Sequence, residues 1–301
     1  MSATEANREG NWALFHMYNS EESGLRLEQK ELINDEEVER LKNSNRTITE
    51  FFASRHVVES VFANRDDVAK ALVAMTKAYI DTPHLVEQIL EQANFDLARR
   101  FANTCSLFRS LLDHFDRYLL KRHGPDSEQY QSWKNCLSTE YDSVLAYRIV
   151  YHMRNYIQHY DMPPLSLSIT DKADEEGFSV RVDIDVDRLM EDKTFKNKLV
   201  VDSFEDRAVS LFHILDDWDA SCKRLVEHVT AIRVQEALPA AHEILNVRKA
   251  LPIGDHGRIA MVYLPAMDKR PEKVSLNLNH LHETKAQIIV RLAEQYQAND
   301  A

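Results

Sequence analysis

The chain of 301 residues is long enough to bury a sizeable hydrophobic core, as one large domain or two. It contains only 6 glycines and 8 prolines, and 29% of its residues are charged, which favours long helices over a β-sandwich or barrel. Its net charge of −12 excludes a protein coated in positive charge for bulk nucleic-acid binding, although it is compatible with a local basic cleft.

Some classes of site are absent from the sequence. The cysteines, Cys105, Cys136 and Cys222, are far apart and lack metal-ligand spacing, so we expect buried thiols in a reducing cytosol. No HExxH or CxxC pattern indicates a metal and no glycine-rich phosphate loop is present, so no cofactor is expected. The N-terminus lacks a signal sequence and no window approaches about 18 apolar residues, which predicts a soluble, cytoplasmic protein without membrane contact.

The first part of the chain has mixed patterns. Residues 1–34 lack a steady period and are predicted to form an irregular arm, partly helical. From Asp35 a helical pattern begins with acids in its first turn, which suit the helix dipole. Breaks near residues 43–45 and 64–66 indicate two shorter helices here.

Three further helical stretches follow, each ended by proline or glycine. The amphipathic stretch Asp66–Ile80 stops at Asp81-Thr82-Pro83, and His84 then opens the longest run, one helix or two in tandem, up to Gly124-Pro125. Asp126–Asp161 comes next, with Asp126 or Ser127 as its N-cap. Because only a short turn joins the last two stretches, we expect them to pack antiparallel.

The pattern changes after Pro164. Leu165–Thr170 and Phe178–Val186 alternate apolar and polar residues, which predicts a β-hairpin. A helical segment interrupted by Pro239 covers residues 204–250. A second strand pair, Arg258–Leu264 with Lys273–Leu278, precedes a final amphipathic helix at 280–297, and the two strand pairs are expected to share one small sheet.

These patterns predict a mainly α protein with a smaller α+β part. Residues 1–65 would form an N-terminal arm and helices that pack on a bundle, and residues 66–163 would form that antiparallel helical bundle. Residues 164–301 would form an α+β module with two strand pairs, whose role the sequence does not indicate.

The stretch Tyr147–Pro164 concentrates reactive side chains beside a sharp helix stop. Arg154 and Asn155 are adjacent, His159 follows four residues after Asn155, and Pro163-Pro164 cannot continue the helix. In helical projection Asn155 and His159 lie about 40° apart on one face, whereas Arg154 and His159 lie about 140° apart. Arg154 and His159 therefore converge only through a loosened last turn or across a symmetric dimer.

The same helix carries a polar strip and an apolar strip. Arg148, Tyr151 and His152 extend the polar strip, with Tyr160 beyond the motif, and we expect these four to contact substrate. The apolar strip expected to pack on the bundle consists of Leu145, Ile149, Met153 and Ile157. Arginine is a permanent forked phosphate ligand and histidine exchanges protons near neutral pH, so this set suits transphosphorylation of RNA without a metal.

This motif resembles that of the HEPN superfamily. Residues 154–159 match the Arg-Asn-x-x-x-His signature of HEPN domains and stand, as in that family, near the end of the last long helix of an antiparallel bundle. The resemblance covers residues 66–163, about a third of the chain. It implies a bundle of four or five helices that dimerises with its two motifs facing each other.

The resemblance also implies an activity. Many HEPN proteins are metal-independent endoribonucleases of toxin–antitoxin, abortive-infection and other antiviral defence systems. By analogy, Arg154 would hold the scissile phosphate, His159 would transfer protons and Asn155 would orient the site, leaving a 2′,3′-cyclic phosphate. The implied partners are an RNA substrate, a second copy of the chain and an antitoxin or defence-system protein.

Other interpretations stay open. Some HEPN proteins only bind nucleotides or assemble, and the bundle would then serve to dimerise a non-catalytic interaction protein. Toxins of the two-gene HEPN type have a tyrosine two residues after the histidine, but that position is Asp161 here and Tyr160 comes one residue early. Control by modification of that tyrosine is therefore not expected. Arg154 and Asn155 would otherwise be solvated, with His159 near the helix dipole.

Charge and nearby acids add weaker hints. Residues 97–160 carry nine Lys and Arg against six Asp and Glu, a surplus of +3 within an acidic chain, which favours phosphate contacts there. Asp113, His114 and Asp116 could reach the motif across the bundle, and an acid there could fix the tautomer of His159. Asp216, Asp217 and Asp219 are read as a solvated face, and His280 and His282 need no function.

Overall fold

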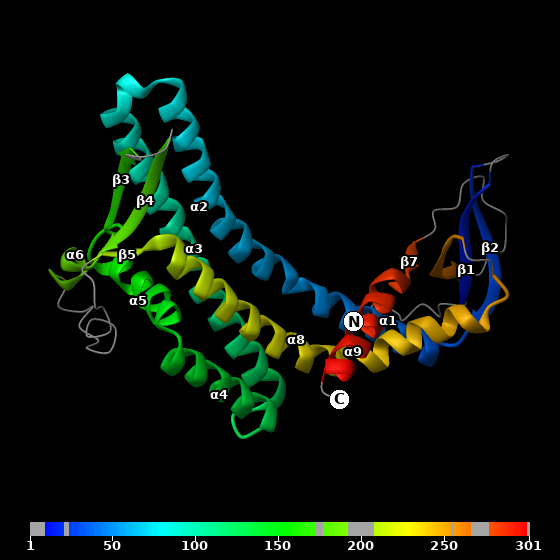
Figure 1. The fold of residues 1–301 in the computed structure, drawn as a ribbon. Coiled ribbons are helices and arrows are strands. Elements are labelled where there is room, and N and C mark those ends of the chain that lie inside the picture. The colour runs from blue at the N-terminus through cyan, green and yellow to red at the C-terminus, as the bar shows by residue number, and fades with distance from the viewer. Residues whose placement is uncertain are drawn as a thin grey trace, which may run out of the picture. The chain divides into compact units, whose positions relative to one another are not determined.

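The computed structural model describes residues 10–20, 24–171, 177–191, 208–253, 256–265 and 277–299. The fold is mostly helical, with long packed helices and two small antiparallel sheets, which confirms the predicted fold class (Figure 1). Two compact units make up the chain: Arg55–Thr230, the helical unit, and Met1–Ser54 with Ala231–Ala301, the sheet unit. The domain limits expected after residues 65 and 163 stay a prediction.

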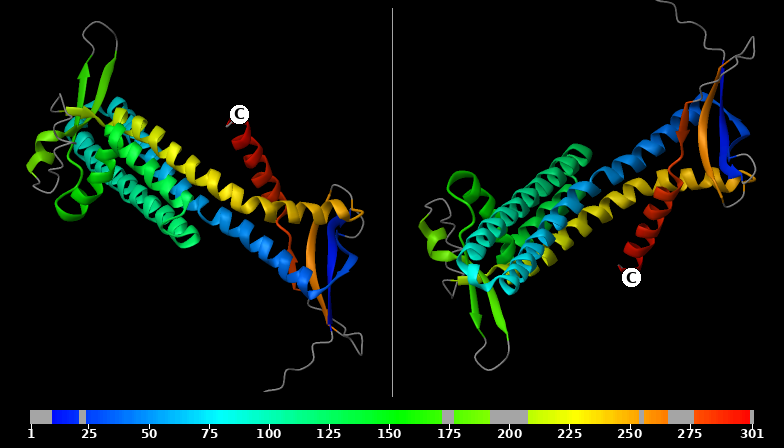
Figure 2. Two further views of the ribbon diagram at one scale, coloured as in Figure 1. Left: turned by 90° about the horizontal axis from the view of Figure 1, so that it is seen from below. Right: turned by 90° about the horizontal axis from the view of Figure 1, so that it is seen from above.

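The helical unit contains the predicted bundle. Helices α2, α3, α4 and α5 pack through neighbouring faces, and Figure 2 shows them side by side. The elements of the unit are α2 (Arg55–Asp81), the 3-10 turn η1 (Pro83–Leu85), α3 (Val86–His123), α4 (Glu128–Ser143), α5 (Leu145–His159), β3 (Leu165–Asp171), β4 (Phe178–Asp185), α6 (Val186–Glu191), β5 (Ala208–Ser210) and α8 (Leu211–Ala250) as far as Thr230.

Local signals set most helix ends of this unit. Thr82 leaves the helical conformation just before Pro83, so α2 ends where the sequence predicts. α3 is a single helix that ends at Gly124, whose φ of 87° lies in the region that glycine tolerates best. Ser127 caps α4 by accepting a hydrogen bond from the Tyr130 amide at 3.2 Å.

The stretch predicted as one helix over Asp126–Asp161 divides at Val144. This residue is extended, with φ −114° and ψ 107°, a conformation that β-branched side chains accommodate readily. Its amide still donates to the Glu140 carbonyl at 3.0 Å, so α4 ends and α5 begins without a loop. The chain therefore turns at Val144, where the sequence has no glycine or proline to indicate the end of a helix.

The helix breaks predicted near residues 43–45 and 64–66 are wrong. Polar side chains at these positions bond to other segments of the chain and do not end the helix. α1 (Asp35–Ala53) runs through the first, where Asn45 Nδ2 donates to the His280 carbonyl at 2.8 Å. α2 runs through the second, where Arg65 Nη2 binds Asp216 at 2.6 Å. Similarly, α8 is helical through Pro239 rather than interrupted there.

Aromatic rings form the centre of the helical unit. Phe108 of α3 is fully buried and meets Tyr147 of α5 and Trp218 of α8 edge-on, with ring centroids 5.5 and 5.2 Å away. Farther along α3, Phe115 meets the buried Trp133 of α4 at 6.0 Å. These edge-to-face contacts hold α3, α4, α5 and α8 together.

A buried ion pair joins α4 to α8. Glu140, only 5% exposed, accepts two bonds of 2.7 Å from Arg224 and one of 2.5 Å from the Ser221 hydroxyl. Burial alone raises the pKa of the Glu140 carboxyl, but the bonds from Arg224 and Ser221 outweigh it and keep this pKa below its usual value. The carboxylate thus stays charged and paired at neutral pH.

The small sheet confirms one sequence prediction and overturns another. β3 and β4 form the predicted hairpin, with Leu165 opposite Ile184, and β5 pairs with β4. The expected single sheet for both strand pairs is wrong, because β6 belongs to a different sheet in the sheet unit. The last predicted strand, Lys273–Leu278, lies mostly outside the described residues, and Leu278 begins β7.

The sheet unit begins with a hairpin where an irregular arm was expected, so that prediction is wrong over residues 10–33. The antiparallel sheet has the order β2-β1-β6-β7. Leu14 faces the helices while Ala13 and Phe15, on the other face, are buried as well. With both faces apolar, β1 shows no alternation in sequence. The elements of the unit are β1 (Gly10–Ser20), β2 (Gly24–Ile33), α1, α8 from residue 231, β6 (Arg258–Pro265), β7 (Leu278–His280) and α9 (Glu283–Asn299).

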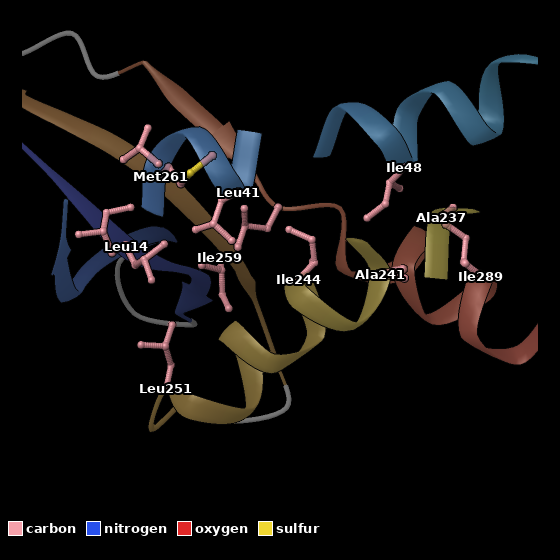
Figure 3. Close-up of a cluster of buried hydrophobic side chains, with 14 residues drawn as sticks. Leu14, Leu41, Ile48, Ala237, Ala241, Ile244, Leu251, Ile259, Met261 and Ile289 are labelled. Atoms are coloured by element: carbon pink, nitrogen blue, oxygen red, sulfur yellow. The ribbon is translucent and has the colours of Figure 1, made fainter. Parts of the chain in front are cut away.

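A hydrophobic core lies between one face of this sheet and the helices α1, α8 and α9 (Figure 3). Leu14 and Ile259 of the sheet meet Leu41 of α1, Ile244 of α8 and Ile289 of α9 in one buried cluster. Buried polar groups at its border are bonded: Glu283 accepts from the Ile259 amide at 2.9 Å and also binds Arg248. The core and these bonds fix the α9 helix, which was predicted at residues 280–297.

Two further predictions concern the whole chain. No helix among the described residues is long and apolar enough to cross a membrane. Cys105 and Cys222 are buried and Cys136 is half-buried, and all three thiols are free. Burial raises the pKa of each thiol, so these cysteines are poor nucleophiles.

The first testable prediction concerns the buried ion pair. We expect Glu140→Gln to lower the free energy of unfolding by about 2 kcal/mol at neutral pH, because it removes the charged partner of Arg224. Because the folded-state pKa of Glu140 is lowered, its contribution is present above the usual value of 4.5 and is lost as pH falls below it. Urea unfolding followed by tryptophan fluorescence, at neutral and acidic pH, measures both effects.

The matched control for this measurement is Glu91→Gln. Glu91 is an exposed residue in the second turn of α3, so its substitution removes the same charge without touching a buried pair. An equal loss of stability in both variants, or a deficit in Glu140→Gln that persists in acid, would contradict the role given to Glu140.

Candidate functional site

Helix α5 carries the predicted motif, and its buried face determines how the motif is presented. Of the predicted apolar strip, Ile149 and Met153 are fully buried, whereas Leu145 and Ile157 are half-buried. The buried stripe is wider than predicted and is completed by four other residues: Ala146, Tyr147, Val150 and Tyr156. This stripe packs on α3 and leaves the opposite face of α5 to the motif.

The end of α5 is held by several contacts. Tyr160 leaves the helical conformation while its amide still donates to the Tyr156 carbonyl at 2.9 Å. Asp161 then accepts a bond from the Met162 amide at 2.7 Å and another from Arg188 of α6 at 2.9 Å. The prolines that follow, at 163 and 164, are both buried. The helix stop predicted from sequence is therefore part of a packed junction.

The three motif side chains are accessible. Arg154 is half-buried, and Asn155 and His159 are exposed. Arg154 Nη1 donates to Asn155 Oδ1 over 3.4 Å, a long and weak bond. Within the described residues no hydrogen bond or ion pair engages His159 and none joins it to Arg154. In a single chain Arg154 and His159 are thus accessible but not bonded to each other, as the helical projection predicts.

The residues expected to extend the site separate into two groups. Tyr160 is exposed beyond the motif, whereas Arg148, Tyr151 and His152 are half-buried. The Tyr141 hydroxyl lies 2.8 Å from His152 Nε2. Burial, and then the charge of Arg148, lower the pKa of His152 below its usual value of 6.5, so its ring is neutral at neutral pH. His152 is therefore more suited to hydrogen bonding than to acid catalysis.

A hollow of about 490 Å³ opens beside the motif, between α3, α4 and α5. Tyr151 reaches into it one turn before Arg154 and Asn155 along α5. Aromatic rings and charged groups of both signs share its walls. The lining residues are Arg109, Leu112, Asp113, Asp116, Lys134, Leu137, Ser138, Tyr141, Asp142, Tyr147 and Tyr151.

Arg109 is the main positive group of this hollow, and the sequence analysis did not single it out. Its guanidinium lies over the Tyr151 ring, 4.8 Å from the centroid, and also donates to the Tyr151 hydroxyl. It also pairs with Asp113 at 3.1 Å. The spacing of Arg109, Asp113 and Asp116 on one face of α3 is the signal that could have revealed it.

The acids predicted to approach the motif contact the hollow instead. Asp113 pairs with Arg109, and Asp116 pairs with Lys134 at 3.3 Å. His114 is exposed and lies outside the residues that line the hollow. No bond joins Asp113 or Asp116 to His159 among the described residues, so neither fixes the tautomer of His159 in one chain.

Ion pairs reduce the positive surplus expected over residues 97–160. Arg99 and Arg100 pair with Asp96 at 3.0 and 3.6 Å, in addition to the Arg109 and Lys134 pairs. Arg154 takes part in no ion pair with an acid in the described parts of the chain. The positive charge of Arg154 is therefore available to a phosphate.

The remaining sequence candidates have structural roles. Asp216 binds Arg65 and Asp219 binds Lys223, both at 2.6 Å, while Trp218 between them is buried. Over the residues that the structure describes, no group of three or more His, Cys, Asp or Glu side chains could hold a metal ion. In the sheet unit, the His282 amide and the His280 carbonyl both bind the Asn45 side chain.

Comparison of the chain with family models, with curated proteins and with solved structures found no match.

The second testable prediction concerns His152. Because its folded-state pKa lies below the usual 6.5, protonation favours the unfolded chain, so stability is full above this value and falls as pH drops through it. We expect His152→Gln, which does not titrate, to flatten the loss of stability between about pH 7.5 and 5.5. The slope is reduced rather than abolished, since burial also lowers the pKa of His228.

Urea unfolding across that pH range measures the slope. His84→Gln removes an exposed histidine of η1 from the same unit and serves as the control. If the stability of His152→Gln falls with pH as steeply as that of the wild type, the lowered pKa of His152 is contradicted.

Proposed function

We propose that the chain is a metal-independent endoribonuclease of the HEPN type that acts as a symmetric homodimer. The observation that carries the proposal is the placement of Arg154, Asn155 and His159: they are accessible at the stopped end of α5, within a bundle of packed helices. Buried side chains on the other face of α5 hold this presentation in place. The chemistry of the three residues suits RNA cleavage without a cofactor.

The proposed reaction is an internal transphosphorylation. His159 accepts the proton of the ribose 2′-OH, the 2′-oxygen bonds to phosphorus, and the bond from phosphorus to the 5′-oxygen breaks. The 5′-oxygen leaves with a proton, so the products carry a 2′,3′-cyclic phosphate and a 5′-OH. Arg154 binds the phosphate oxygens, where negative charge develops, and Asn155 orients these groups. Cleavage of cellular RNA fits a toxin or an antiviral defence effector, restrained by a partner protein.

The geometry of one chain supports the proposed dimer. On a regular helix Arg154 and His159 point about 140° apart, and no bond joins them within the described chain. Two α5 ends that face each other across a two-fold axis would place Arg154 of each chain near His159 of the other. The homodimer is thus a requirement of the proposed reaction.

A second candidate function is nucleotide binding without cleavage, which the hollow beside Tyr151 favours. Its walls offer tyrosine rings for stacking and both Arg109 and Asp116 for hydrogen bonds. This function would use the bundle as an interaction module and would leave Arg154 and His159 dispensable.

The third testable prediction separates the two functions. We expect RNA cleavage in the presence of EDTA by the wild type and a decrease of about 100-fold or more in Arg154→Ala and in His159→Ala. Gln158→Ala is the matched control, because Gln158 is exposed at the same end of α5. Product ends with a 2′,3′-cyclic phosphate confirm the reaction type. Cleavage that survives both substitutions would sink the nuclease proposal, and RNA binding without cleavage would support the second function.

Mixing the two inactive variants tests the shared site. A heterodimer of Arg154→Ala and His159→Ala chains keeps one Arg154 facing one His159, so about a quarter of wild-type activity should return after random exchange of subunits. If both residues act from the same chain, mixing restores nothing.

A further inference from the structure

Strand β2 forms an open edge of the four-stranded sheet in the sheet unit. Among the described residues it pairs with β1 alone, and from Gly24 to Gln29 every residue is exposed. Two of these are leucines: Leu25 is 60% exposed and Leu27 is 37% exposed. A long edge with apolar side chains is a template for another strand, because half of its backbone groups face outward.

The usual protection of such an edge is strongest at the end of β2, and the stretch 24–29 before it carries two charged side chains, Arg26 and Glu28. A bulge shifts the register between Leu14 and Phe15 of β1, opposite Lys30, and charged residues follow at Lys30 and Glu31. Before the bulge the pairing is regular as far as Gly24. The stretch 24–29 is therefore open to a partner strand, whereas the end of β2 is not.

The register of β2 on β1 assigns the side chains of this stretch to two faces. Leu27 lies opposite Met17 and Gln29 lies opposite Phe15, so Leu25, Leu27 and Gln29 share one face of the sheet. Arg26 and Glu28, opposite Tyr18 and His16, share the other face. Each face thus has its own chemistry, one apolar and one with charges of both signs.

We propose that β2 pairs antiparallel with β2 of a second copy of the chain, about a two-fold axis at Leu27. Leu27 then lies opposite the partner's Leu27, and Leu25 lies opposite the partner's Gln29. On the other face Arg26 lies opposite the partner's Glu28, and the symmetry repeats this pair. The two sheets become one sheet of eight strands, given four in each chain.

Other symmetric registers fit less well. An axis at Glu28 places Glu28 opposite the partner's Glu28 and Arg26 opposite the partner's Lys30, so like charges meet. An axis at Arg26 places two arginines together. An axis at Gln29 puts Leu27 opposite the partner's Glu31 and runs into the bulge. Of these axes, only the one at Leu27 gives an apolar pair and opposite-charge pairs within the regular stretch 24–29.

Glu28 already has a partner in its own strand, Lys30 at 2.7 Å. Its side chain is 51% exposed, so a second cation can approach. In the proposed register Lys30 faces the partner's Gly24, which has no side chain to compete. The proposed contact lies in the sheet unit and does not depend on the proposed nuclease function.

The fourth testable prediction is a cross-link specific to this register. Directly opposite residues of antiparallel strands have Cα atoms about 4.5–5.5 Å apart, which suits a disulfide. In a Cys136→Ser background, since Cys105 and Cys222 are buried, we expect Leu27→Cys to form a covalent dimer on mild oxidation. Leu25→Cys is the control: two such residues lie four positions apart, about 13 Å, and should stay unlinked. Absence of the Leu27→Cys dimer, or equal linking through Leu25→Cys, would overturn the proposal.

Charge exchange gives a second readout, measured as the molar mass in solution. Arg26→Glu and Glu28→Arg each place like charges opposite each other, so each variant alone should lose this contact. Their mixture should regain it as a heterodimer, because the introduced glutamate of one chain then faces the introduced arginine of the other. A folding defect would not be repaired by mixing, and a mixture that remains unassociated would count against the proposed register.

The same cross-link keeps the two proposals apart. We expect Arg154→Ala and His159→Ala to leave the Leu27→Cys dimer unchanged, because both residues lie in the helical unit. Loss of RNA cleavage with an intact cross-link tests the nuclease proposal alone. Loss of the cross-link with intact RNA cleavage tests the β2 pairing alone.

Discussion

The contact on which the functional argument depends is the burial of Phe108 against Tyr147 and Trp218. These three rings come from α3, α5 and α8, and together they fix the rotation of α5 about its axis. Turning α5 by one residue, about 100°, would carry a charged or polar motif side chain into an aromatic core. The motif is therefore accessible because the opposite face of its helix is so completely apolar.

The break at Val144 has a second consequence for the site. In a continuous helix Tyr141 and Tyr147, six residues apart, would point about 120° away from each other. Because the chain turns at Val144, their ring centroids lie 6.3 Å apart and Tyr141 also meets Tyr151 at 6.1 Å. The hollow beside Tyr151 is lined by these three rings, so an extended residue between two helices helps to shape it.

Local sequence signals predicted the elements whose ends are set by local chemistry. Pro83, Gly124 and Ser127 end or begin helices by restricting or capping the backbone, and the alternation in β3 and β4 reflects a sheet with one buried face. The wrong predictions concern residues whose contacts lie far away in the sequence. Asn45 suggested a break because its bond to His280 is not visible in sequence, and β1 showed no alternation because both its faces are buried.

The same distinction applies to the site. The spacing of Arg154, Asn155 and His159 on a late helix was readable from the chain, and so was their exposure beside a helix stop. Arg109 was not, because its importance depends on Tyr151, 42 residues later, which holds the guanidinium in the hollow. Charge counting also misled, since the surplus over residues 97–160 leaves out Asp96, which pairs with Arg99 and Arg100.

Two symmetric contacts in one chain have consequences that neither has alone. A pair of copies that closes both contacts forms a finite dimer, and the first contact then raises the effective concentration for the second. Copies that use the two contacts with different neighbours form a growing assembly instead. In either case, in the proposed dimer Arg154 and His159 meet only when chains associate, so the proposed reaction would depend on protein concentration. A site divided between chains would be inactive in a free monomer, and this would be a direct physical means of restraining the proposed ribonuclease.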